Sequence, residues 1–264
     1  MKIIVCMKQV PDTTEVRLDP VTNTLIRTGI PSIINPDDKA GIEAALEIKE
    51  KLPGTTVTVI SMGLPSVDIA LREALAMGCD DAILLTDRKL GGADTWATSS
   101  SIAGALRHLD YDLIICGRQA IDGDTAQVGP QIAEHLGIPQ VSYVEEISEI
   151  TEDHLVVRRQ FEDRYQMIEV ALPCLITTLS ELNKPRYMTV GGCFDAYEKE
   201  VRIMTYADIA DVVDESNIGL KGSPTNVVKS MSKQGKGQGE ILKDLTADEA
   251  AAAIVERLAA RHLI

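Results

Sequence analysis

A loop rich in glycine, aspartate and threonine lies at residues 116–130, and its composition suits the binding of phosphate groups. It follows an apolar segment typical of a buried parallel strand, and it precedes a helical pattern at 131–136. In α/β proteins such a loop presents free backbone N–H groups and the positive end of a helix dipole to an anion. Asp124 could cap the helix, and Asp122 could accept a hydrogen bond from a ribose hydroxyl or an adenine amine.

Other loops with suitable residues also follow predicted strands. In the loop 87–95, two adjacent glycines give backbone freedom, and Asp94 or Thr95 could cap the next helix; a capped helix without a ligand is the plain alternative. Asn35 precedes a proline at a helix start, where it could cap the helix or form hydrogen bonds with the edge of an adenine ring. The loop at 61–63 ends a predicted strand and offers free backbone N–H groups. Because the carboxyl ends of parallel strands meet at one edge, we expect these loops to share a crevice.

Composition argues against several classes of protein. No apolar run approaches the ~20 residues that a membrane-spanning helix needs, and residues 1–6 predict a strand rather than a signal peptide. A net charge of -14 argues against binding to nucleic acid or to an anionic membrane surface. The five cysteines are scattered without a C-x-x-C pair, which is typical of a reduced cytoplasmic protein without an iron–sulfur cluster.

Neither a metal site nor a catalytic acid–base site is predicted. The four histidines lie far apart in the sequence, without the spacing of zinc ligands. The chain also has no G-x-S-x-G sequence, no Walker lysine loop and no classical G-x-G-x-x-G fingerprint. We therefore expect binding or cofactor chemistry rather than hydrolysis by side chains.

Strand and helix patterns alternate over residues 1–145, which predicts an α/β fold with a parallel sheet covered by helices on both faces. The expected strands of this part are 3–7, 57–62, 82–86 and 113–116, and the expected helices are 37–51, 66–77 and 95–109. A hairpin is expected at 16–27, antiparallel strands at 141–150, 155–161 and 165–170, and a further strand at 174–177.

The pattern changes in the last third of the chain. Residues 189–240 have little sustained periodicity, and 230–239 predicts a flexible, extended connector. An alanine-rich helix is expected at 247–263, with apolar residues on one face. That face must pack on a partner subunit or back on the parent domain, and the spacing of its apolar residues does not decide between these two arrangements.

Six ordered sequence elements resemble one known family. They are Val5-x-x-Lys8-x-Val-Pro11, Asn35-Pro36, Cys116-Gly-x-Gln-Ala-Ile-Asp122-x-Asp124, Pro173-x-x-Ile-Thr177, Leu182-Asn-x-Pro-Arg-Tyr187 and Gly219-Leu-x-Gly-Ser-Pro-Thr225. In these elements and their spacing the chain resembles the beta subunit of electron transfer flavoproteins along essentially its whole length. The resemblance implies a Rossmann-like, adenine-nucleotide-binding sheet with antiparallel additions and an extended C-terminal arm.

The first loop resembles the electron-bifurcating, anaerobic type of this family. The mitochondrial type carries Asp-Asp-Asp-x-Asn-Gln-Thr where this chain has Asp122-Gly-Asp-Thr-Ala-Gln-Val-Gly-Pro130, and it binds a structural AMP. The smaller residues Gly123, Ala126 and Gly129 leave room for a larger ligand. The resemblance therefore implies FAD in this subunit, with AMP as the alternative. The second loop implies a transient NAD(H) site.

The implied function is NADH-dependent electron bifurcation in a heterodimer with an alpha subunit. One electron passes to ferredoxin or flavodoxin, and the other passes through the FAD of the alpha subunit to an acyl-CoA dehydrogenase. The alternative is an AMP-binding structural subunit of a single-FAD protein. A third class, a nucleotide-sensing module without redox work, stays open from the residues alone.

The resemblance also implies where ligands and partners bind. The nucleotide-binding domain covers 1–225 and includes a dehydrogenase-docking loop at about 186–200, with Val190 as its anchor; 226–264 is an arm that packs on the alpha subunit. The implied cofactor-binding residues are Cys6, Asn35, Asp38, Ser61, Met62, Gly91, Gly92, Asp94, Thr95, Thr98, Asp122, Gly123, Asp124, Thr125, Ala126, Gln127 and Val128.

Overall fold

The computed structural model describes residues 1–12, 31–225, 228, 237 and 239–264. It divides into two compact units, Met1–Val227 and Val228–Ile264. The predicted hairpin at 16–27 lies outside the described residues, as does most of the predicted connector at 230–239.

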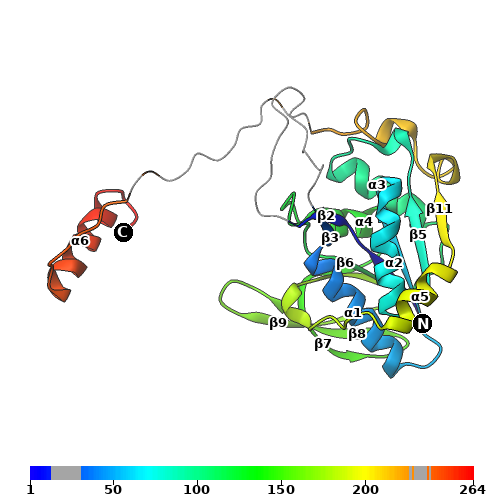
Figure 1. Cartoon of the computed structure of the whole chain (residues 1–264), viewed down its shortest axis with the longest axis horizontal. Coiled ribbons are helices and arrows are strands. Elements are labelled where there is room, and N and C mark those ends of the chain that lie inside the picture. Colours follow the sequence, from blue (N-terminus) through cyan, green and yellow to red (C-terminus); the bar gives the residue numbers. More distant parts are fainter. Residues whose placement is uncertain (13–30, 226–227, 229–236, 238) are drawn as a thin grey trace. The chain divides into compact units, whose positions relative to one another are not determined.

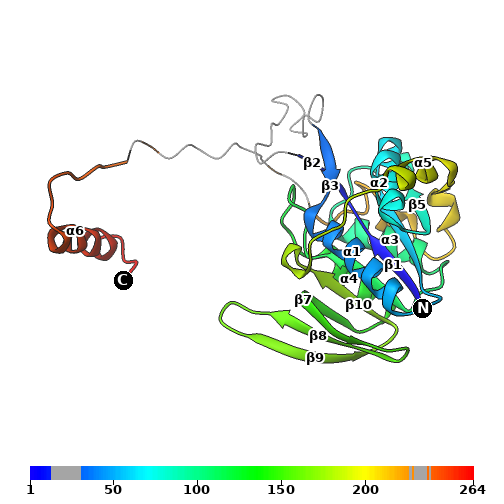
Figure 2. The same cartoon turned by 60° about the horizontal axis from the view of Figure 1, so that its bottom comes forward.

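A nine-stranded sheet forms the centre of the first unit, in the order β11-β5-β4-β1-β6-β10-β7-β8-β9 (Figures 1 and 2). Neighbouring strands pair parallel from β11 to β7, and β8 and β9 continue the sheet antiparallel. The strands are β1 Lys2–Cys6, β4 Thr56–Met62, β5 Asp81–Leu85, β6 Leu113–Gly117, β7 Gln140–Ile150, β8 His154–Gln160, β9 Tyr165–Ala171, β10 Cys174–Thr178 and β11 Val201–Met204. A small separate sheet pairs β2 (Gln9–Pro11) with β3 (Ser32–Ile34). The predicted mainly parallel α/β fold with antiparallel additions is confirmed.

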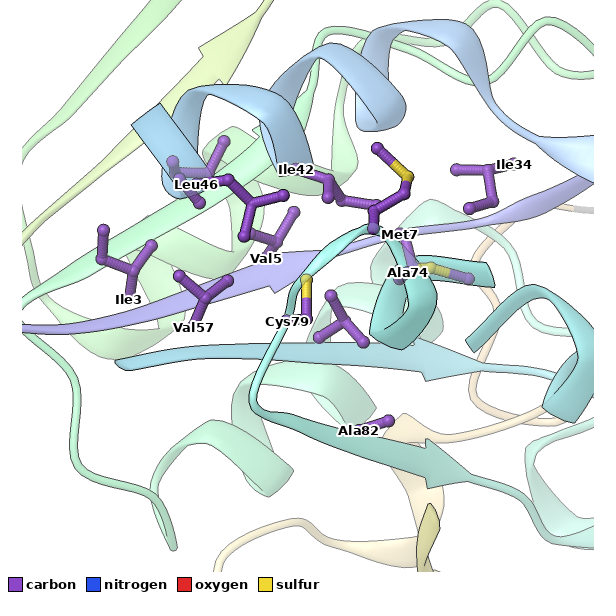
Figure 3. Packing of buried hydrophobic residues seen from close by; sticks show 14 of the residues in the cluster. Ile3, Val5, Met7, Ile34, Ile42, Leu46, Val57, Ala74, Cys79 and Ala82 are labelled. Atoms are coloured by element: carbon purple, nitrogen blue, oxygen red, sulfur yellow. The ribbon is translucent and has the colours of Figure 1, made fainter. Parts of the chain in front are cut away.

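Helices cover both faces because successive strand residues point to opposite sides. Ile3 and Val5 of β1 belong to one apolar cluster with Ile42 and Leu46 of helix α1 (Figure 3). Ile4 belongs to the second cluster, on the other face. The first face carries α1 (Pro36–Lys51), α2 (Asp68–Met77) and α5 (Val190–Glu198), and the second carries α3 (Thr95–Leu106) and α4 (Val128–Leu136).

The chain reverses its direction of travel across the sheet between β1 and β6. From β1 it moves outward through β4 to β5, and helix α3 then returns it to β6 on the opposite side of β1. In open α/β sheets the carboxyl ends of the two strands at such a switch point flank the crevice where ligands bind. The fold therefore places the end of β1 and the loop after β6 at one position.

Two expectations about regular structure were wrong. Helix α4 begins at Val128 rather than 131, because the first turn of a helix tolerates Pro130, whose missing N–H would have no intrahelical partner there. The segment 189–240 is not irregular throughout, since it contains α5 and β11. Of the residues of α5 only Ala196 is buried, so the helix lacks the broad apolar stripe that a sequence pattern reveals.

The second unit contains helix α6 (Ala247–Ala259). Thr246 and Glu249 form a capping box at its start, which pairs two N–H groups that the helix itself leaves free. None of its residues is buried. Among the described residues, no helix is long and apolar enough to cross a membrane.

Candidate nucleotide-binding site

The site is centred on the carboxyl ends of β1, β4 and β6. Cys6 of β1 lies in register with Cys116 of β6, and both are buried. Contact with Cys6 and burial raise the pKa of the Cys116 thiol, so this thiol stays protonated and serves as packing. Ser61 and Met62 end β4 beside them. The Ser61 hydroxyl is buried without a hydrogen-bond partner among the described residues, so a polar group is left over at this edge.

The loop between β6 and α4 has an uncommon backbone. Asp124 and Ala126 have φ angles of 50° and 53°, in the left-handed region that side chains other than glycine rarely adopt. Such strained conformations concentrate at ligand sites. The expectation that Asp124 caps α4 was wrong: its carboxylate accepts a hydrogen bond from the Gln119 side chain, with Nε2 2.9 Å from Oδ1.

A run of backbone N–H groups in this loop has no partner among the described residues. The run comprises Thr125, Ala126, Gln127, Val128 and Gly129. Gln127 is the N-cap of α4, but its side chain makes no capping bond, and the first turn holds no acidic residue. The positive end of α4 is thus open, as the binding of a diphosphate requires.

The first turn of α1 holds the start of this loop. The Asn35 side chain donates to Gln119 O at 2.8 Å and accepts from Ile121 N at 3.0 Å, so it ties the loop and does not cap α1. Asp38 accepts from the backbone N–H of Gly117 at 2.9 Å. Both side chains are buried, so they hold the loop instead of facing solvent.

Asp38 is also bound to the end of β1. Its Oδ2 accepts from Lys8 N at 2.7 Å. Burial raises the pKa of the Asp38 carboxyl to about 7, although the N–H donors of Lys8 and Gly117 and the Asn35 side chain act to lower it. The carboxyl therefore titrates near neutral pH.

Asp122 is not a free carboxylate. Its Oδ1 lies 2.6 Å from the Nζ of Lys8, and its side chain is only 8% exposed, whereas that of Lys8 is 47% exposed. The pair connects the loop to the segment after β1, and the two opposite charges neutralise each other.

The small residues of the loop have different roles. Among the described residues, nothing lies within 4 Å of the position that a Cβ on Gly123 would take, so this residue leaves space open. The interpretation of Gly129 as ligand space was wrong. A Cβ there would lie 2.7 Å from Thr177 Cγ2 and 3.3 Å from Cys116 Cβ, so Gly129 allows α4 to pack closely on the sheet.

The second predicted loop differs from the first at its helix start. Asp94 caps α3, accepting from Ala97 N at 3.0 Å, and it also accepts from Thr225 N at 2.9 Å. Although burial acts to raise it, these hydrogen bonds lower the pKa of the Asp94 carboxyl. The positive end of α3 is therefore already occupied by a carboxylate. The two loops meet where Thr95 Oγ1 donates to Gln127 Oε1 at 2.8 Å.

The remaining residues of the second loop lie beside this contact. Leu220 N donates to the carbonyl of Gly91 at 3.0 Å, and Gly92 has a φ of 75° beneath the Leu220 side chain. Thr98 lies in the first turn of α3. The segment before Thr225 thus covers part of the predicted NAD(H) loop.

Sequence reasoning missed two residues of the site. Lys8 belonged to a family element, but its pairing with Asp122 was not foreseen, and neither was the fit of Gly117 against Asp38. Any Cβ on Gly117 would collide with Asp38 Oδ1. The sequence signals that could have indicated these contacts were the position of Lys8 directly after a predicted strand and the position of Gly117 at the end of another.

The strand order and the open loop at the switch point define an α/β protein of the nucleotide-binding class. Residues 22–208 match the electron transfer flavoprotein domain. The chain is 58% identical to the electron transfer flavoprotein subunit beta of Clostridium acetobutylicum, over the whole of both chains. It is 52% identical to the caffeyl-CoA reductase–Etf complex subunit CarD of Acetobacterium woodii and 47% identical to the acryloyl-CoA reductase electron transfer subunit gamma of Anaerotignum propionicum, again over both full lengths. The chain belongs to the electron transfer flavoprotein family, as a beta subunit.

Proposed function

We propose that this chain, in a heterodimer with an alpha subunit, binds FAD at the first loop, takes hydride from NADH and bifurcates the electrons. One electron goes to ferredoxin or flavodoxin, and the other goes through the FAD of the alpha subunit to an acyl-CoA dehydrogenase. The observation that carries the proposal is the run of N–H groups at the start of α4, on the switch point of the sheet, which have no partner within the described part of the chain.

These N–H groups suit a diphosphate, which offers several acceptor oxygens and negative charge. Two hydroxyls add hydrogen-bonding groups for the remainder of the nucleotide. One belongs to Thr125, which is exposed in the loop, and the other to Ser61, which has no partner among the residues that the structure describes. By this proposal Cys6 and Met62 form the apolar floor at the strand ends.

The bifurcating type is supported by two relatives whose names place them in complexes with CoA-thioester reductases, caffeyl-CoA reductase and acryloyl-CoA reductase. The space beside Gly123 also suits a ligand larger than AMP. When bound, FAD would supply the ability to accept two electrons together and to release them singly. By this proposal, this chain's own residues bind and orient the ligands.

NAD(H) would approach along the second loop. Because Asp94 occupies the positive end of α3, the ligand would rely on the backbone of Gly91 and Gly92 and on the hydroxyls of Thr95 and Thr98. The hydrogen bond from Thr95 to Gln127 joins this loop to the first one and would hold the two ligands together.

Helix α5 supplies a surface for the acyl-CoA dehydrogenase. Val190 and Phe194 are 78% and 74% exposed, and Tyr187, just before the helix, is 90% exposed. Arg186 fixes the start of this segment by donating to Glu43 and Glu50 on α1. Exposed apolar side chains on a fixed base are typical of binding anchors.

The arm at 226–264 would pack on the alpha subunit. Ile254 and Val255 of α6 are 59% and 54% exposed, and an isolated helix of this length is only marginally stable in water. Burying its apolar side chains against a partner would supply the missing stability.

Anaerobic titration of the heterodimer with NADH tests the function. We expect NADH to bleach the flavin absorbance, and ferredoxin reduction to require the dehydrogenase and its substrate at the same time. Flavin that NADH leaves oxidised would contradict bifurcation and favour the alternative, an AMP-binding structural subunit.

A further inference from the structure

One buried carboxylate joins the two strand ends that flank the switch point. Asp38 Oδ2 accepts from Lys8 N, two residues beyond the end of β1, and Oδ1 accepts from Gly117 N, at the end of β6. Each oxygen thus holds one strand end. The nucleotide loop begins at the second of these ends.

The surroundings leave little freedom to this arrangement. Gly117 has no room for a side chain because Asp38 fills that space. Asn35, on the same helical turn, holds the loop at Gln119 and Ile121. The first turn of α1 therefore fixes the loop up to Thr125, where the N–H groups without a partner in the described ranges begin.

Protonation would break this arrangement at one oxygen. A carboxylate accepts hydrogen bonds at both oxygens, whereas a carboxylic acid carries a hydrogen on one of them. At that oxygen the O–H of the acid would face a backbone N–H, so two donors would meet and the hydrogen bond would be lost. Among the described residues, the charged or titratable groups facing Asp38 are Lys8, Asp37 and Cys116. The ammonium of Lys8 is engaged by Asp122, and Asp37 lies against Arg118 and Ser180.

We propose that Asp38 is a positioning residue whose ionised carboxylate sets the first loop in the geometry that binds the nucleotide diphosphate. The inference rests on the proposed nucleotide site and adds its dependence on a proton. Since burial places the pKa of Asp38 at about 7, the ionised fraction rises about tenfold between about pH 6 and pH 8.

Calorimetric titration with ADP tests this in the full-length chain combined with its alpha subunit and stripped of nucleotide. For the unmodified protein we expect the ADP affinity to rise up to about tenfold from about pH 6 to pH 8, beyond the change caused by the titration of ADP itself. Asp38→Asn, which mimics the protonated acid, should bind ADP about tenfold more weakly at pH 8 and should lose that additional pH dependence.

Asp37→Asn is the matched control. It removes the neighbouring carboxylate of the same turn, which accepts from Ser180 N and lies against Arg118 but takes no hydrogen bond from Lys8 N or Gly117 N. This variant should therefore keep the pH dependence. A purely structural role for Asp38 would lower the stability of the fold and the ADP affinity together, without changing the pH profile.

Equal ADP affinity and an equal pH profile in Asp38→Asn and the unmodified protein would overturn the inference alone. If Asp38→Asn does not fold, the pH series of the unmodified protein decides, and a profile that follows ADP alone overturns it. No ADP binding at any pH would overturn the proposed nucleotide site and, with it, this inference.

Discussion

Replacing Asp38 by asparagine should change how stability depends on pH. The carboxyl is buried, and its pKa is raised from 3.8 to about 7 in the folded chain. Between these two values the folded state holds a proton that the unfolded state has released. The free energy of unfolding of the unmodified chain should therefore fall as pH rises from about 4 to about 7.

The size of the effect follows from the two pKa values. One pKa unit corresponds to about 1.4 kcal/mol, so this group should lower the free energy of unfolding by roughly 4 kcal/mol across the window. Asparagine does not titrate, and every other ionisable group is common to both proteins. The variant should thus have about the same stability as the unmodified chain near pH 4 and should become more stable than it towards pH 7.

Urea unfolding followed by circular dichroism at several pH values measures this difference directly. We expect the stability gap between Asp38→Asn and the unmodified full-length chain to widen by roughly 1.4 kcal/mol per pH unit and to level off above about pH 7. A gap that stays constant with pH would refute the assignment of Asp38 as a buried group titrating near neutrality. If the stability difference widens and Asp38→Asn also binds ADP more weakly, the charge of the Asp38 carboxylate supports nucleotide binding while it lowers the stability of the fold.

Further substitutions test other contacts. Gly129→Ala should lower the free energy of unfolding by about 1–3 kcal/mol because its Cβ would press on Thr177, whereas Gly123→Ala, with nothing nearby, should leave it unchanged; equal effects would contradict the packing role of Gly129. Asp94→Ala should cost about 0.5–2 kcal/mol in thermal or urea unfolding through loss of the α3 cap, and no loss would argue against that role. Phe194→Asp should slow electron transfer to the acyl-CoA dehydrogenase in a steady-state assay while NADH still reduces the flavin at the usual rate; a normal transfer rate would exclude α5 as the docking surface.

The strands of the large sheet other than β11, and both loops, could be predicted because their signals are local. Apolar runs ending in loops of Gly, Asp and Thr indicate parallel strands followed by helix starts, and the structure confirms that pattern at β6 and α4. The cap by Asp94 was also predicted, since its acceptor role involves a residue three positions away.

The contacts that shape the site were not predictable in this way because they join distant parts of the chain. Asp38 and Gly117 are 79 residues apart, and Asp94 and Thr225 are 131 apart. A pattern of residue types does not state which buried carboxylate meets which strand end. Helix α5 was missed for a different reason: it exposes apolar side chains instead of burying a stripe.

The composition of the bound nucleotides tests the central claim most directly. The heterodimer, purified from its native expression and denatured, should release two FAD and no AMP, one FAD coming from the first loop of this chain. One FAD together with one AMP would contradict the bifurcating function and leave this chain as a structural, AMP-binding subunit.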